Sequence, residues 1–163
     1  MNPSPRPDTS PDFTILLAIC DGGGTLQPQL DSYLQQVLKP SHILASDDGS
    51  RDDSAAQFDA FAHHAKAAGI CCHRVKGPCR GATANFFSLL AQASPASRYV
   101  ALSDQDDIWL PHKLFDASQL LAPHADTPAL LGTRSWEWDS RHNQRQLSRM
   151  VPQPHDFRHA LVQ

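Results

Sequence analysis

Short apolar segments alternate with segments of helical periodicity along most of this sequence, and this alternation is what most constrains the fold. Residues 13–20 form a near-continuous apolar run of strand length, which is typical of a strand buried on both faces of a parallel sheet. Further strands are predicted at 42–46, 70–75, 99–103 and 129–133. The pattern predicts an α/β protein with a mostly parallel sheet flanked by helices.

Helices are predicted between these strands, where apolar residues recur every three or four positions. The first apolar stripe runs from Leu30 to Leu38 and ends at Pro40. A second helix is expected to begin at the capping-box pair Ser50 and Asp53 and to end at Gly69. The inner faces of two more helices carry Phe86, Leu89, Leu90 and Ala93, and, after Pro111, Leu114, Ala117 and Leu121. A short strand entering a turn is predicted at 136–139.

The length of 163 residues fits one compact domain, predicted at 13–163. Residues 1–12 are rich in proline and polar side chains and are predicted to form a disordered tail. A net charge of -3 with scattered Lys and Arg argues against a nucleic-acid partner. The longest apolar run, 13–20, is too short to span a membrane, and residues 1–12 lack the apolar region of a signal peptide. Together with cysteines that do not form a secreted pattern, this predicts a cytoplasmic location.

Cysteine spacing gives little support to a disulfide framework or a metal site. The four cysteines match neither CxxC nor a secreted pattern, which favours reduced thiols. A zinc site formed by Cys71, Cys72, His73 and Cys79 is the weaker alternative, because adjacent cysteines on a strand point to opposite faces.

Acidic residues follow three of the predicted strands. They are Asp21, Asp47, Asp48, Asp104, Asp106 and Asp107. In open parallel sheets ligands bind beyond the carboxyl ends of the strands, where these carboxylates would gather. Their repulsion implies a cation, and Mg²⁺ or Mn²⁺ suits carboxylate oxygen together with substrate phosphates. Because 22–24 is not a phosphate-binding glycine loop, metal would have to neutralise a pyrophosphate.

Each acidic segment has a simpler interpretation when it is taken alone. Residues 47–50 match a turn with a helix cap, and Asp104-Gln105-Asp106 matches many exposed loops. Their joint position at strand ends favours a functional site. A phosphotransfer receiver or phosphatase would also place acids there, but it needs a Lys after a late strand, where this chain has Thr133 and Arg134.

Three parts of the sequence resemble family 2 glycosyltransferases, most closely the bacterial rhamnosyltransferase-like subgroup. The similar segments are 29–32 with 46–50, 76–86, and 103–114, and the resemblance covers about 13–133. It implies a GT-A fold, which is Rossmann-like, holding a nucleoside-diphosphate sugar at the carboxyl ends of the strands. The subgroup makes dTDP-rhamnose a candidate donor.

The resemblance also implies residue roles in donor binding. Cys20 and Asp21 stand where the family commonly has Tyr-Asn, and they would line the base pocket largely through backbone. Asp48 matches the acid that hydrogen-bonds the base, and Asn85 is a further candidate for donor binding.

The remaining implied roles concern the diphosphate and the metal. Asp104 and Asp106 match the ends of the family's DxD motif, with Asp104 near the ribose and the metal waters and Asp106 as the direct metal ligand. Gln105 fills the variable middle position.

Catalysis in this family also needs a general base, which lies well beyond the DxD segment. Asp156 matches neither its motif nor its position, so no catalytic residue is assigned and the acceptor-binding part is predicted to be missing. The expected acceptor is a glycan or a lipid-linked glycan, which would place the protein peripherally at the inner membrane face. The alternative is a catalytically inactive remnant that only binds nucleotide or a partner.

Overall fold

The structure is a computed structural model that describes residues 12–139 and 141–149. Chain contacts divide the protein into two compact units, Met1–Pro123 and His124–Gln163, which are considered separately. The tail predicted at 1–12 lies, apart from Asp12, outside the described residues. None of the helices in the described part has the length and apolar character needed to cross a membrane.

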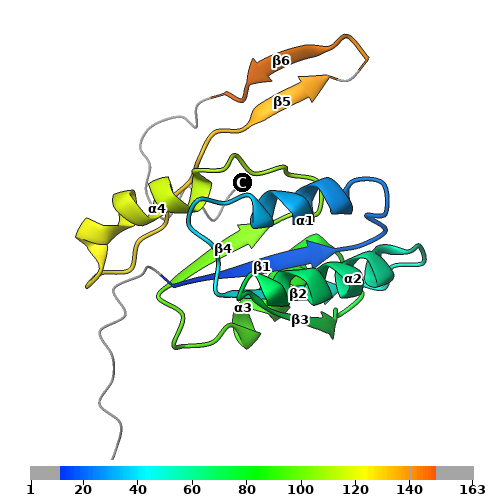
Figure 1. The fold of residues 1–163 in the computed structure, drawn as a ribbon, viewed down its shortest axis with the longest axis horizontal. Helices are drawn as coiled ribbons and strands as arrows, with labels where there is room; N and C mark the ends of the chain where they lie inside the picture. Colours follow the sequence, from blue (N-terminus) through cyan, green and yellow to red (C-terminus); the bar gives the residue numbers. More distant parts are fainter. Residues whose placement is uncertain (1–11, 140, 150–163) are drawn as a thin grey trace, which may run out of the picture. The chain divides into compact units, whose positions relative to one another are not determined.

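A four-stranded parallel sheet forms the centre of the first unit (Figure 1). Its strands are β1 (Phe13–Ile19), β2 (His42–Asp47), β3 (Cys71–Lys76) and β4 (Tyr99–Ser103), in the order β3-β2-β1-β4. Because β1 is central, the loops that follow β2 and β4 flank the loop that follows β1. The four strands were predicted to within one residue, and the α/β fold is confirmed.

The central strand is buried along its whole length, which explains its near-continuous apolar sequence. Ile15, Leu17 and Ile19 face the larger core, whereas Leu16 and Ala18 face a smaller core on the opposite side. This division follows from the alternation of side chains along a strand. A strand covered on both faces has no position for a charged side chain before its end.

Helices cover the two faces of the sheet unequally. The larger core contains side chains of α1 (Leu26–Leu34), α2 (Ser54–Ala67) and α4 (Lys113–Leu121). The smaller core is closed by α3 (Ala82–Gln92), through Leu89. The predicted end of the second helix at Gly69 is confirmed, since Gly69 has a φ of +79° that favours glycine.

The first helix differs from its prediction of 30–38 at both ends. It begins at Leu26 and stops at Leu34, and Val37 is 59% exposed instead of buried. The cause is tertiary, because the Val37 N–H donates to the carbonyl of Pro111 at 2.8 Å and so makes no helical bond. The chain therefore leaves the helix before Pro40 is reached.

The predicted capping box at the second helix is also wrong. The helix begins at Ser54, and Asp53 at the N-cap makes no side-chain capping bond. The Ser50 hydroxyl instead accepts a hydrogen bond from the backbone N–H of Asp21 at 3.0 Å. Ser50, which was predicted to cap the helix, thus joins the loop after β2 to the loop after β1.

The second unit contains a β-hairpin. The strand predicted at 136–139 is β5 (Trp136–Asp139), and it pairs antiparallel with β6 (Gln144–Leu147). The strand predicted at 129–133 is not formed, and Leu130 is 76% exposed. An apolar run becomes a strand only where a neighbouring strand supplies a hydrogen-bonded ladder and a surface to pack on.

Candidate functional site

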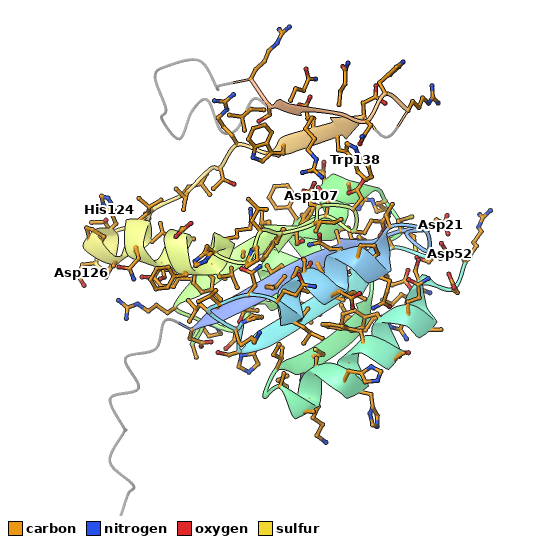
Figure 2. The ribbon with its side chains drawn as sticks, turned by 45° about the horizontal axis from the view of Figure 1, so that its top comes forward. Asp21, Asp52, Asp107, His124, Asp126 and Trp138 are labelled. Carbon is orange, nitrogen blue, oxygen red and sulfur yellow. The ribbon has the colours of Figure 1, made fainter. Side chains whose placement is uncertain are left out.

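The candidate site lies at the carboxyl edge of the four-stranded sheet, in the loops after β1, β2 and β4. Figure 2 shows Asp21 and Asp52 near each other beyond the end of β1. The structure brings the β1 and β2 loops together through the hydrogen bond from the Arg51 N–H to Asp21 Oδ1, at 2.7 Å. Asp21 has a φ of +50°, an uncommon conformation for a non-glycine residue.

Four consecutive backbone N–H groups after β1 are all engaged by side chains. The acceptors are Gln105 Oε1 for Cys20, Ser50 Oγ for Asp21, Ser54 Oγ for Gly22 and Asp52 Oδ2 for Gly23, at 2.7 to 3.0 Å. These donors are therefore occupied in the structure and form no cradle for a phosphate group. This agrees with the absence of a phosphate-loop sequence at 22–24.

The two acids after β2 organise the surrounding backbone. Asp47 Oδ1 accepts hydrogen bonds from the N–H groups of Gly49 and Ser50, at 3.2 and 2.8 Å. Asp48 accepts from the N–H of Cys79 at 2.6 Å through Oδ1 and from that of Gly81 at 2.9 Å through Oδ2. Asp48 therefore fixes the loop between β3 and α3, and each of its oxygens keeps a second lone pair for another donor.

Asn85 lies beneath this loop and is only 1% exposed. Its amide Nδ2 donates to the carbonyl of Ser46 at 3.0 Å, which joins α3 to the end of β2. Its Oδ1 is buried without a hydrogen-bond partner. A Cβ at Gly77 would stand 2.9 Å from Asn85 Oδ1 and 2.7 Å from Asp48 Oδ1, so the close packing here requires glycine.

The acids after β4 differ from those after β2. Asp104, Asp106 and Asp107 are exposed, and their carboxylates accept no hydrogen bond from any residue that the structure describes. Burial, followed by the charges of Asp107 and Asp106, raises the pKa of the Asp104 carboxyl. These carboxylates are available to an external cation, whereas those of Asp47 and Asp48 are already used.

The start of this acidic segment is held by a buried polar network. Ser103 Oγ accepts hydrogen bonds from Tyr33 Oη at 2.7 Å and from Gln29 Nε2 at 2.9 Å. Burial raises the pKa of the Tyr33 hydroxyl, so it stays protonated and remains a donor. The end of the segment is fixed by Trp109, whose side chain is buried and whose backbone N–H donates to Ser32 Oγ at 3.2 Å.

Negative charge also surrounds Cys20, on the other side of the site. The pKa of its thiol is raised by partial burial and then by the charges of Asp21, Asp48 and Asp47. Both the β1 loop and the β4 loop are thus acidic environments. An anionic ligand would need a cation to approach them.

The residues present fit a metal ion that is shared with a ligand, and not a closed protein site. No group of three or more His, Cys, Asp or Glu within the described ranges is arranged to hold a metal. The alternative zinc site around Cys71 is therefore not formed among these residues. Mg²⁺ and Mn²⁺ are commonly held by one or two carboxylates together with phosphates and water. The free carboxylates of Asp104 and Asp106 match that requirement.

Sequence reasoning missed the role of Gln105. Its Oε1 accepts the N–H of Cys20 and its Nε2 donates to the carbonyl of Cys20, at 2.7 and 2.9 Å. The resemblance gave Gln105 only the variable middle position of the DxD motif, and nothing local indicates a contact with a residue 85 positions earlier. Gly22, two residues after Cys20, is the signal that could have indicated close packing here.

Solved structures with the same fold identify its class. The mannosyltransferase PcManGT from Pyrobaculum calidifontis, in complex with GDP-Man and Mn²⁺, has a TM-score of 0.61 at 20% identity over 73% of this chain and 34% of that one. TarS from S. aureus has a TM-score of 0.56 at 17% identity over 87% of this chain and 23% of that one. The 1–349 fragment of TarS with UDP-GlcNAc has a TM-score of 0.53 at 20% identity over 69% and 32%. The fold is therefore that of GT-A glycosyltransferases.

The family is established by the sequence. The profile of the family described as glycosyl transferase family 2 matches residues 14–161, and this chain belongs to that family. No curated protein sequence matches the chain. The chain spans between about a quarter and a third of the length of the solved structures that it resembles.

Proposed function

We propose that this chain binds a nucleoside-diphosphate sugar together with Mg²⁺ or Mn²⁺, as the donor-binding part of a glycosyltransferase. The observation that carries the proposal is the different use of the acids at one edge of the sheet. Asp47 and Asp48 hold backbone N–H groups, whereas Asp104 and Asp106 are exposed and accept no hydrogen bond from a described residue. Asp47 and Asp48 therefore have a structural role, whereas the carboxylates of Asp104 and Asp106 are available to a ligand.

In this proposal the base of the nucleotide lies near the β1 and β2 loops. Cys20 and Asp21 would line the base pocket, and Asp48 would accept a hydrogen bond from the base with a remaining lone pair. Asn85 would act indirectly, because its side chain is buried and holds the end of β2 through Ser46. Partial burial and then the carboxylate charges of Asp21 and Asp48 raise the pKa of the Cys20 thiol, and these carboxylates favour a neutral base over an anionic group at this position.

The diphosphate would lie near the β4 loop. Asp106 would be the direct ligand to the cation, and Asp104 would hold its waters and the ribose. A bound divalent cation supplies charge stabilisation to the diphosphate as it leaves the anomeric carbon of the sugar. The protein residues would fix the position of the donor so that an acceptor hydroxyl can approach that carbon.

The acceptor and the location are proposed by analogy with the family. We propose a glycan or a lipid-linked glycan as the acceptor, and a cytoplasmic protein that associates peripherally with the inner face of the membrane. Cell fractionation tests the location: the protein should appear in the cytoplasmic fraction or be released from membranes by high salt. Retention on membranes after salt and carbonate washing would contradict peripheral association.

Calorimetric titration tests the donor site directly. UDP and dTDP are titrated into the protein with and without Mn²⁺, and dTDP-rhamnose is the first sugar donor to examine. At least one nucleotide should bind, more tightly when Mn²⁺ is present. If neither nucleotide binds with or without the metal, the donor-site proposal is wrong.

The assignment of the metal ligand is tested by Asp106→Ala. We expect this variant to lose the Mn²⁺-dependent part of nucleotide binding and to keep the wild-type thermal midpoint, because the Asp106 carboxylate holds no backbone group. Asp116→Ala, an exposed acid on α4, is the matched control and should bind like the wild type. An unchanged nucleotide affinity in Asp106→Ala would refute the assignment.

A second candidate function is nucleotide binding without transfer. It is favoured by the residues assigned above, which account for binding of a nucleotide and a cation but include no general base for transfer. An assay of sugar transfer and of donor hydrolysis separates the two functions. Turnover by this chain alone would exclude the purely binding role.

A further inference from the structure

We propose that Gln105 is a positioning residue that sets the distance between the base-binding and metal-binding sides of the site, a role that rests on the proposed donor binding. Gln105 lies between Asp104 and Asp106, two of the three exposed acids of the β4 loop. The oxygen and the nitrogen of its side-chain amide both form hydrogen bonds with the backbone of Cys20 in the β1 loop.

The contact extends the hydrogen bonding between β1 and β4 beyond the end of their paired residues. The strands β1 and β4 are paired in parallel up to Leu17 and Ser103. Beyond this point the Gln105 amide replaces the missing backbone partner, accepting from the Cys20 N–H at 2.7 Å and donating to the Cys20 carbonyl at 2.9 Å. A primary amide can do both, since it carries an acceptor oxygen and two N–H donors.

Gly22 provides independent evidence that this contact is closely packed. A Cβ built on Gly22 would lie 2.5 Å from Gln105 Oε1 and 2.7 Å from Gln105 Cδ, so only glycine leaves room for the amide. Gly24, two residues later, has no atom within 4 Å of such a Cβ. A side chain at 22 would therefore displace the Gln105 amide, whereas one at 24 would meet no atom.

Other hydrogen bonds of the β1 loop are made with the segment from the end of β2 to the start of α2. Asp21, Gly22 and Gly23 donate to side chains of the β2–α2 segment, at Ser50, Ser54 and Asp52. Gln105 instead connects this assembly to the β4 loop. Removing the amide leaves both loops folded on their own supports but frees one to shift against the other.

The chemistry of the position also favours an amide over an acid. Gln105 is flanked in sequence by Asp104 and Asp106, and the pKa of the thiol of its partner Cys20 is raised by partial burial and then by the charges of Asp21 and Asp48. A carboxylate at 105 would add charge to this acidic edge and could not donate to the Cys20 carbonyl. A protonated carboxylic acid could make both bonds.

The experiment measures UDP affinity by calorimetry in the presence of saturating Mn²⁺. Gln105→Ala and Gly22→Ala should each bind UDP about tenfold more weakly than the wild type, as expected for the loss of two hydrogen bonds that position the site. The double variant should be no weaker than either single variant, since both remove the same contact. Gly24→Ala is the matched control and should bind like the wild type.

Gln105→Glu tests the donor half of the contact. At pH 7 its UDP affinity in saturating Mn²⁺ should be reduced like that of Gln105→Ala, because a carboxylate cannot donate to the Cys20 carbonyl. A Gln105→Glu variant that binds UDP like the wild type would contradict a positioning role for the amide.

Amide hydrogen exchange provides a test that does not require nucleotide. In Gln105→Ala the Cys20 amide, which loses its acceptor, should exchange faster than in the wild type, while the amides of Asp21 and Gly22 and those of β2 should be unchanged. Equal exchange in the two proteins overturns the inference, whether or not nucleotide binds. Faster exchange with wild-type UDP affinity also overturns it, because the contact would then not position the site. A wild-type protein that binds no nucleotide refutes the proposed function separately.

Discussion

At the residue scale, the acids of the site divide by the atoms that they contact. Asp48 is an internal anchor, whose two oxygens accept the N–H groups of Cys79 and Gly81. Asp104 and Asp106 have exposed side chains and no donor among the described residues. The same residue type therefore serves structure in one loop and is available for chemistry in the next.

Removal of the anchor should destabilise the protein. Asp48→Ala is expected to lower the free energy of unfolding by about 2–4 kcal/mol, because two charge-assisted hydrogen bonds are lost and two N–H groups lose their partner. Urea denaturation measures the change. Asp106→Ala is the control and should stay within about 0.5 kcal/mol of the wild type. Equal losses in both variants would contradict the division of roles.

The raised pKa of Asp104 predicts a pH dependence of stability. A carboxyl group with a higher pKa in the folded chain than in the unfolded chain binds its proton more tightly when folded, so stability falls as pH rises through the interval between the two pKa values. Asp104→Asn removes this contribution. We expect its thermal midpoint to equal or exceed that of the wild type at pH 7, and this advantage to shrink as the pH falls below the usual Asp range.

The wild type and Asp104→Asn also test whether a divalent cation binds at Asp104. Added Mn²⁺ and UDP should raise the thermal midpoint of the wild type more than that of Asp104→Asn, since the metal binds the deprotonated group. A variant that is less stable than the wild type at pH 7 without metal would show that Asp104 has a favourable partner in the fold.

At the scale of the elements, the first helix acts as the support of the acidic segment. Gln36, just beyond α1, is 1% exposed and spans the gap to the segment before α4. Its Nε2 donates to the carbonyls of Ser32 and Leu110, and its Oε1 accepts the N–H of Leu114, at 2.9 to 3.2 Å. The position of the β4 loop thus depends on the early end of α1.

Gln36→Ala should therefore cost about 1–3 kcal/mol of unfolding free energy, because it leaves the buried Leu114 N–H without this partner and removes one hydrogen bond to the Leu110 carbonyl. Denaturant unfolding measures the loss. The neighbouring exposed residue gives the control: Gln35→Ala should change stability by less than about 0.5 kcal/mol. Similar losses in the two variants would show that Gln36 is not the link between α1 and the 110–114 segment.

At the scale of the whole molecule, every residue assigned to donor binding belongs to the unit that ends at Pro123. The two cores of the sheet are also formed within this unit, with none of their residues beyond Ala117. The unit has its own core, which is the condition for independent folding.

A fragment of residues 12–123 is therefore expected to unfold cooperatively and to bind UDP with Mn²⁺ as tightly as the full chain. Circular dichroism on heating and calorimetric titration measure the two properties. The full chain, prepared in parallel, is the control. A fragment that shows no cooperative transition would mean that residues after 123 complete the fold.

Much of this protein is determined by its sequence alone. The buried strands need near-continuous apolar residues, and their alternation with helical stripes predicted the sheet, its helices and the acids at its edge. These features are local, since each depends on the period of side chains along one segment. The acids Asp21, Asp48 and Asp104 could be placed at the same edge because parallel strands end there together.

Only the tertiary structure decided which partner each residue takes. Ser50 looked like a helix cap but accepts the Asp21 N–H, and α1 ends early because Val37 bonds Pro111. Residues 129–133 had the composition of a strand but have no strand structure. Gln105 bonds Cys20 across 85 residues of sequence. Hydrogen bonds between distant segments form only where the fold brings a donor and an acceptor within about 3 Å, and no local pattern records that distance.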